Sequence, residues 1–236
     1  MSEPYRAENL LDRLTDAETL QVHYDQEMRR EREILARGLA LEGGDVLSVG
    51  CGWHPGRHLF PKPGFRMTGV DLDGAMIATL LANGELDAGR VARAGELPYP
   101  DRSYDVVLYR LVLHHIAYQG PLAPVFSEAK RLLRPGGALV AVEPGSWHPV
   151  GAGLALANRA GLATWTHGTP DDIPLSPRAL VAEARAAGLA PELHGLTYGW
   201  RRLPAPIQRW IHRLDPLGSR PRVAPFAHTL LLIARA

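Results

Sequence analysis

A glycine pair and an aspartate, each placed after an apolar run, are the residues of this chain best suited to bind a ligand. Gly50 and Gly52 directly follow an apolar run, and Asp71 ends the next apolar run. Small residues let backbone amides approach a ligand closely, and a carboxylate can accept two hydrogen bonds from a ribose diol. In a parallel sheet both motifs would meet at the carboxyl edge of the strands. This layout predicts a nucleotide-like cofactor site, with glycines that only serve tight turns as the structural alternative.

Four side chains further along the chain could contact a substrate at the same edge. His114 and His115 follow the fourth predicted strand, and Trp147 and His148 follow the fifth. Histidine titrates near neutral pH, so His115 or His114 could serve as a general base. A buried, hydrogen-bonded histidine and a packed tryptophan are the structural alternatives. We therefore expect a substrate pocket near these residues, with His115 as the first candidate base.

Cys51, His54 and His58 are spaced like part of a metal site. No carboxylate or second cysteine completes the set, so we predict no bound metal. Cys51 is the only cysteine of the chain, which excludes an intrachain disulfide. Its position in a tight backbone turn favours an inert thiol.

Strands that alternate with helices would position these groups. The predicted strands are apolar throughout instead of alternating, which is typical of a parallel sheet covered on both faces. The strands are expected at 45–49, 65–71, 91–93, 104–109, 138–142, 193–197 and 229–234, and the helices at 19–41, 75–86, 121–133 and 176–187. The pattern predicts an α/β fold.

Three further motifs follow the glycine loop in a fixed order. They are Gly95-Glu-Leu-Pro-Tyr-Pro-Asp-Arg-Ser-Tyr-Asp-Val-Val107, Leu111-Val-Leu-His-His-Ile116 and Leu132-Leu-Arg-Pro-Gly-Gly137. This series resembles the class I S-adenosylmethionine-dependent methyltransferases of the ubiquinone/menaquinone C-methyltransferase type, whereas NAD enzymes lack it. The resemblance covers about 45–143. It implies a Rossmann-like, mostly parallel seven-stranded sheet with helices on both faces, and S-adenosyl-L-methionine as the cofactor.

The resemblance also implies which residues would surround that cofactor. Gly50 and Gly52 would lie against its amino-acid part, Asp71 would hold the ribose, and Leu72 would flank the adenine. Tyr24, in the N-terminal helix, would cover the methionine end. The full set of cofactor-binding residues implied in this way is Tyr24, Ser48, Gly50, Cys51, Gly52, Asp71, Leu72, Arg93, Ala94, Gly95, Arg110 and Leu111.

Three positions depart from the family pattern. Ser48 stands where the family usually has an acid, His54 replaces the third glycine of the loop, and Arg93 replaces the acid or amide at the adenine edge. The Arg93 side chain cannot accept a hydrogen bond from the adenine amino group. We therefore expect the Ala94 backbone or a neighbouring group to take that role.

The chain is expected to form one methyltransferase domain over 1–236. We assign N-terminal cap helices to 1–44, the cofactor-binding core to 45–143, a lid or substrate insertion to 144–175, and the last helix and strands to 176–236. A basic amphipathic insertion occupies 198–225.

This basic insertion combines arginines with an apolar helical face. Its apolar residues Leu203, Ile207, Trp210, Ile211 and Leu214 would share that face. The structural interpretation is a helix docked on the sheet edge with solvated arginines. The alternatives are an anionic substrate, a membrane surface, or a homodimer or other surface contact through the basic helix 203–214.

Composition limits the functions to consider. The chain has 26 basic and 25 acidic side chains and a formal net charge of +1, which gives no general attraction to nucleic acid or acidic lipid. An acidic N-terminus and the lack of long apolar runs favour a cytoplasmic protein without stable membrane insertion. We predict a methyltransferase that acts on O, N or C of a small molecule. A protein or RNA methyltransferase, and a fold member that binds the cofactor without methyl transfer, are the alternatives.

Overall fold

The computed structural model describes residues 15–52, 54–160 and 173–236. Its centre is a seven-stranded sheet of order β3-β2-β1-β4-β5-β7-β6. The strands are β1 (Gly44–Val49), β2 (Phe65–Asp71), β3 (Ala88–Val91), β4 (Tyr104–Arg110), β5 (Leu133–Pro144), β6 (Ala190–Thr197) and β7 (Thr229–Arg235). Strands β1 to β5 pair in parallel, and β7 runs antiparallel to β5 and β6. The predicted Rossmann-like, mostly parallel sheet is confirmed.

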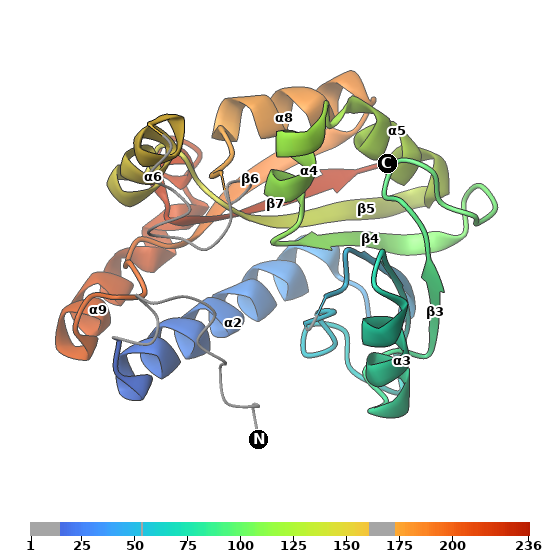
Figure 1. Cartoon of the computed structure of the whole chain (residues 1–236), viewed down its shortest axis with the longest axis horizontal. Coiled ribbons are helices and arrows are strands. Elements are labelled where there is room, and N and C mark those ends of the chain that lie inside the picture. The colour runs from blue at the N-terminus through green and yellow to red at the C-terminus, as the bar shows by residue number, and fades with distance from the viewer. Residues whose placement is uncertain (1–14, 53, 161–172) are drawn as a thin grey trace.

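Helices cover both faces of this sheet (Figure 1). On one face lie α4 (Leu113–Gln119), α5 (Ala123–Leu132) and α8 (Pro177–Ala186), and on the other lie α2 (Ala17–Leu39) and α3 (Gly74–Ala82). The remaining described helices are α6 (Pro149–Arg159), α9 (Ala205–Ile211) and the two 3-10 helices η1 (His212–Ser219) and η2 (Ala224–Phe226). Helices α6 and α9 lie at the end of the molecule to which the carboxyl ends of β4 and β5 point. No described helix is both long and apolar enough to cross a bilayer.

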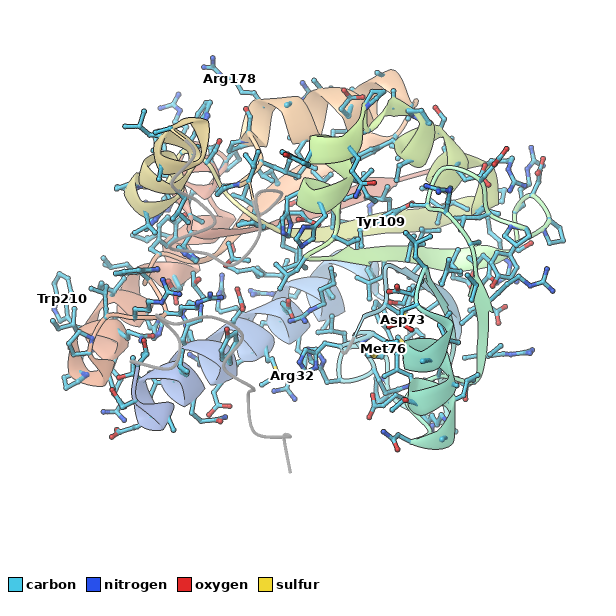
Figure 2. The ribbon with its side chains drawn as sticks, viewed as in Figure 1. Arg32, Asp73, Met76, Tyr109, Arg178 and Trp210 are labelled. Atoms are coloured by element: carbon cyan, nitrogen blue, oxygen red, sulfur yellow. The ribbon has the colours of Figure 1, made fainter. Side chains whose placement is uncertain are left out.

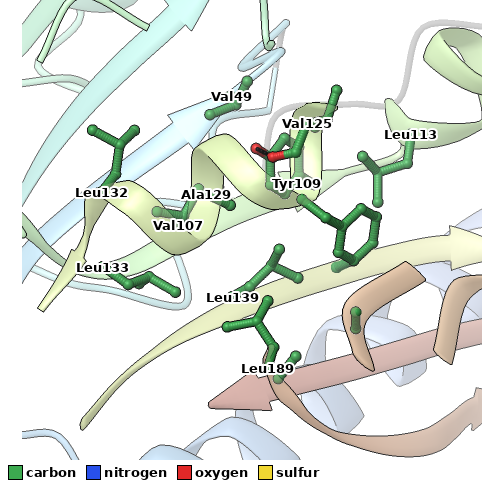
Figure 3. Close-up of a cluster of buried hydrophobic side chains, with 14 of the residues drawn as sticks. Val49, Val107, Tyr109, Leu113, Val125, Ala129, Leu132, Leu133, Leu139 and Leu189 are labelled. Atoms are coloured by element: carbon green, nitrogen blue, oxygen red, sulfur yellow. Dashed lines mark hydrogen bonds between the residues drawn. The ribbon is translucent and has the colours of Figure 1, made fainter. Parts of the chain in front are cut away.

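An apolar core lies on each face of the sheet. Under α5, the fully buried Tyr109 and Phe126 pack with Leu139, and the Tyr109 hydroxyl donates to the Val125 carbonyl at 3.4 Å (Figure 3). On the opposite face Ile34 joins a second cluster of buried side chains. Both faces of the central strands are therefore buried, which explains why their sequences are apolar without alternation.

Helix α2 confirms the predicted N-terminal helix but buries an unexpected set of side chains. The Asp16 carboxylate caps it by accepting from the Thr19 amide at 2.8 Å, and Ala40 ends it in a left-handed conformation. Beside the apolar Leu20, Ile34 and Leu35, this helix buries the polar residues His23, Gln26, Glu27, Arg30 and Glu31. The hydrophobic period detects only the apolar residues, so this polar side was not predicted.

Several other elements differ in extent from the sequence prediction, among them α3, β3 and β5. Helix α3 ends at Ala82 because Asn83 caps it and Gly84 follows with φ +73°. Strand β3 occupies Ala88–Val91 instead of 91–93, since this mostly exposed edge strand has no apolar run to mark it. Strand β5 begins at Leu133, five residues before the predicted start at 138.

The structural interpretation of the basic insertion, a helix whose apolar face docks on the sheet edge, is wrong. Helix α9 and η1 turn Ala205, Gln208, His212 and Asp215 inward. The apolar face that was expected to dock is outward instead, with Ile207 and Trp210 among its exposed side chains. Polar contacts with α2, described below, fix this orientation. Of the predicted lid 144–175, residues 161–172 lie outside the described residues.

Candidate cofactor site and active site

The loop after β1 has the shape that the glycine motif predicts. The amides of Gly50 and Cys51 both donate to the Val70 carbonyl, at 2.7 and 3.1 Å, and so bind the loop to the end of β2. Gly50 has φ +64°, and a Cβ there would clash with the Val112 side chain. Only glycine satisfies both conditions. Ser48 precedes the loop, where it is buried within β1 between Gly69 of β2 and Leu108 of β4.

Asp71 ends β2 and faces this loop. Its Oδ2 accepts from the Gly52 amide at 2.9 Å, and its Oδ1 accepts from the Asp73 amide at 3.1 Å. Each carboxylate oxygen accepts one hydrogen bond here and has the capacity to accept another. The next side chain, Leu72, is 63% exposed, which leaves an apolar surface beside the carboxylate. Asp71 and Leu72 therefore lie together, as their predicted contacts with ribose and adenine require.

The segment expected at the adenine edge lies on the surface. Arg93 and Gly95 are exposed, and Ala94 is half-buried. The Glu96 amide donates to the Arg93 carbonyl at 3.1 Å and closes a tight turn over this segment.

The metal-like spacing of Cys51, His54 and His58 does not bring these side chains together as a metal-binding group in the described part of the chain. Residues 15–52, 54–160 and 173–236 contain no group of three histidine, cysteine, aspartate or glutamate side chains arranged to hold a metal. His58 lies 3.2 Å from Glu31, and His54 is exposed. Burial, followed by the charge of Asp71, raises the pKa of the Cys51 thiol to about 12.

Glu143 organises the start of α4, a short helix that the sequence prediction missed. It extends from β5 and is fully buried, with Oε1 accepting from the amides of Val112 and Leu113 at 3.0 and 2.8 Å. Its Oε2 lies 2.6 Å from His114 Nδ1. No side chain at the start of α4 caps this helix. Glu143, about thirty positions further along the chain, caps it instead.

The two candidate bases have different surroundings as a result. The His114 side chain is 5% exposed and bound to Glu143, as the structural alternative for this residue requires. His115 is half-buried, and its ring lies 4.0 Å from that of His114 between centroids. Of the two, only His115 retains the exposure that contact with a substrate needs.

Arg110, at the end of β4, is paired with a residue of α2 that the sequence prediction missed. Its Nε and a terminal nitrogen both donate to the Glu31 carboxylate at 3.1 Å. The Glu31 side chain is fully buried, and that of Arg110 is 11% exposed. Burial acts to raise the pKa of Glu31, but Arg110 and His58 outweigh it and lower that pKa. Leu111, the next residue, is 43% exposed with φ +56°.

A second buried carboxyl on α2, Glu27, lies one turn before Glu31. Burial and then the nearby charge of Glu31 raise its pKa, and a hydrogen bond with Thr229 opposes that rise. Arg110 and Arg201 are close enough to act on the same carboxyl. Glu27 therefore lies at the carboxyl edge of the parallel strands, near the end of β4 and the start of β7.

Four histidines continue this polar region away from the glycine loop. Ring centroids are separated by 5.2 Å for His148 and His228, 5.9 Å for His228 and His23, and 6.3 Å for His23 and His212. Burial lowers the pKa of His23 to about 3, and it also lowers the pKa of His148 and His228. Of the predicted pocket residues, His148 belongs to this row. Trp147 instead packs against Phe226 and carries the Arg178 guanidinium 4.9 Å from its ring centroid.

Comparison with known proteins identifies the central part of the chain. Residues 47–141 match the family described as "Methyltransferase domain". The chain contains a class I S-adenosylmethionine-dependent methyltransferase domain. It is 37% identical to a "Probable S-adenosylmethionine-dependent methyltransferase" of Mycolicibacterium smegmatis over 49% of this chain and 44% of the relative. It is 32% identical to a demethylmenaquinone methyltransferase of Tropheryma whipplei over 43% of this chain and 42% of that relative.

The sequence matches therefore span less than half the length of these curated relatives. A solved SAM-dependent methyltransferase of Thermotoga maritima has the same fold, with a TM-score of 0.63 at 14% identity, over 92% of this chain and 90% of that one. The family and the fold together imply S-adenosyl-L-methionine as the cofactor of the methyltransferase domain.

The residues of the methyltransferase domain suit that cofactor. The loop backbone at Gly50, the carboxylate of Asp71, where we expect the ribose, and the exposed Leu72 lie together at the carboxyl edge of the sheet. Tyr24 lies beyond them on α2, with its hydroxyl 3.5 Å from Arg201. Sequence reasoning missed the charged residues Glu27, Glu31 and Glu143 and the histidines His23, His212 and His228. Their partners lie far away in the chain, so no local motif marks them.

Proposed function

We propose that this protein transfers the methyl group of S-adenosylmethionine to O, N or C of a small molecule. The observation that carries the proposal is the joint placement of Gly50, Gly52 and Asp71 at the carboxyl edge of the sheet, beside the exposed Leu72. The bound cofactor would supply an electrophilic methyl group on a sulfonium. An acceptor held at this edge would have to present a lone pair on O or N, or a π electron pair on C, to that methyl group, with S-adenosylhomocysteine as the leaving group.

The protein's part in this reaction is mainly to hold the reactants in line. Alignment can contribute much of the rate of a transfer between two bound groups. An acceptor that starts protonated must also lose a proton, and His115 is our candidate for receiving it. His148, the half-buried end of the histidine row, supplies a further polar group that would contact the acceptor.

Cofactor binding by Asp71 variants tests the site itself. We expect Asp71→Ala to weaken S-adenosylhomocysteine binding by about tenfold or more in calorimetry, because charge-assisted hydrogen bonds to the ribose are lost. Asp71 also accepts a hydrogen bond from the Gly52 amide, so Asp71→Ala removes a loop contact as well. Asp71→Asn is the matched variant, because its one side-chain oxygen can still accept that hydrogen bond. We expect it to bind with intermediate affinity. Equal affinity in wild type and Asp71→Ala would show that the cofactor binds elsewhere.

A protein of this fold that binds the cofactor without methyl transfer is the second candidate. Two observations favour it: Ser48 replaces an acid beside the loop, and the Arg110 guanidinium is already bound to Glu31. A panel of small O-, N- and C-nucleophiles, assayed for S-adenosylhomocysteine release, separates the two. Tight binding with no turnover on any acceptor would favour the second candidate.

A further inference from the structure

The segment 203–226 presents several large apolar side chains to solvent and buries the polar residues Gln208, His212 and Asp215. Gln208 is fully buried, and its side-chain nitrogen, which carries two N–H groups, lies within hydrogen-bond distance, 2.7–3.1 Å, of the backbone carbonyls of Thr19, Arg201 and Leu203. Asp215 is also fully buried. It accepts from the Gln26 side chain at 2.6 Å and from the Tyr198 amide at 3.0 Å. These bonds prevent α9 and η1 from turning their apolar side inward, since rotation would leave buried polar groups without partners.

Four large apolar side chains form the outward face. They are Ile207, Trp210, Leu214 and Leu217, which are 47%, 62%, 44% and 38% exposed. Their spacing of three, four and three residues places them on one side of the α9–η1 segment. Figure 2 shows Trp210 at the outer end of the molecule, directed away from the sheet. We call these four residues the apolar patch.

The exposed charges of the same segment are all positive. Arg209, Arg213, Arg220 and Arg222 are exposed, and the only acid of 203–226, Asp215, is buried. Arg209 pairs with Glu18 of α2 at 2.6 Å. Within the described part of the chain, no carboxylate forms an ion pair with the other three arginines. A large exposed tryptophan among leucines and isoleucine, with arginines around it, is typical of helices that lie in a lipid interface.

We propose that the apolar patch and these arginines dock the protein on an anionic lipid surface. Charge decides between this occupant and a second copy of the chain. A symmetric contact would bring like-charged arginines together without an acid to balance them, which is unfavourable. Anionic headgroups instead complement the arginines, and the boundary between headgroups and acyl chains accepts the apolar patch. Docking turns the α9 end of the molecule, where the carboxyl ends of β4 and β5 point, toward the lipid (Figure 1).

Vesicle binding tests this proposal. We expect the protein to sediment with vesicles of phosphatidylcholine containing about one third phosphatidylglycerol, and to bind weakly to phosphatidylcholine alone. High salt should weaken the binding because it screens the arginines. Trp210→Ser with Leu214→Ser should weaken it by about tenfold or more. Arg213→Gln, Arg220→Gln and Arg222→Gln together should weaken it by about a hundredfold, from about fivefold for each charge.

Matched substitutions elsewhere on the surface serve as controls. Leu81→Ser changes an exposed leucine of α3, and Arg66→Gln with Arg90→Gln changes exposed arginines of β2 and β3. Both controls should bind vesicles like the wild type, and circular dichroism should show that all variants are folded. The proposal is overturned if anionic vesicles do not bind, or if the patch variants bind as well as the controls. It is also overturned if light scattering shows a dimer that the patch variants convert to monomers, because the face then joins two copies.

Discussion

Substitutions of the two neighbouring histidines at the start of α4 should have different effects: His114 should affect stability, and His115 should affect turnover. His114→Asn removes the ring bound to the buried Glu143, so we expect the free energy of unfolding to fall by about 1–3 kcal/mol in urea titrations. His115→Asn should leave stability nearly unchanged, because the ring is half-buried. Once an acceptor is found, turnover by His115→Asn should lose the pH dependence that a base near neutrality imposes. Full activity with an unchanged pH profile would exclude His115 as the base.

Arg93 offers a second test at the scale of single residues. Its side chain is exposed at the predicted adenine edge and can only donate hydrogen bonds. We expect Arg93→Asp to keep or tighten S-adenosylhomocysteine binding, because a carboxylate can accept from the adenine amino group. Calorimetry on both proteins measures this, with Arg90→Asp on β3 as the surface-charge control. If Arg93→Asp binds at least tenfold more weakly while the control does not, Arg93 itself makes a contact with the cofactor.

The connection between α2 and β4 depends on the buried Glu31–Arg110 pair. Glu31→Ala leaves the Arg110 guanidinium buried without its carboxylate, and we expect a loss of about 3–5 kcal/mol in the free energy of unfolding. The double variant Glu31→Leu, Arg110→Met replaces both charges by apolar groups, so it should recover most of that stability. Chemical denaturation of the wild type and the two variants measures both effects. A double variant no more stable than Glu31→Ala would show that the pair is not the source of the loss.

The methyltransferase motifs could be read from the sequence because each lies within a few consecutive residues. The glycine loop, the acid ending β2 and the apolar strands predicted the sheet and the edge at which a cofactor would bind. The buried side of α2 could not be predicted this way: Glu31 meets Arg110 79 positions away, and Gln26 meets Asp215 189 positions away. The orientation of α9 was predicted wrongly for the same reason. The polar contacts of Gln208 and Asp215 outweigh the apolar face that periodicity detects.

At the scale of the whole molecule, the buried histidine row makes stability depend on pH. Burial lowers the pKa of His23, His148 and His228 in the folded protein, and neighbouring charges, including those of Arg201 and Arg202, add to this for His228. In the unfolded chain these histidines titrate near 6.5. Below that pH the unfolded state binds more protons, so the free energy of unfolding falls as pH falls. From pH about 7.5 to about 5.5, each histidine that stays neutral in the folded protein contributes a loss of about 1.4 kcal/mol.

Glu27 has the opposite effect, which provides an internal control for this prediction. Its raised pKa lets the folded protein bind a proton before the unfolded chain does, so its contribution to stability grows as pH falls. Urea titrations at the two pH values should therefore show a smaller pH effect in His23→Asn, by about 1.4 kcal/mol, and a larger one in Glu27→Gln. If both variants keep the wild-type difference, neither group changes its protonation on unfolding. If the two variants change the pH effect in the same direction, the lowered pKa of His23 and the raised pKa of Glu27 cannot both be right.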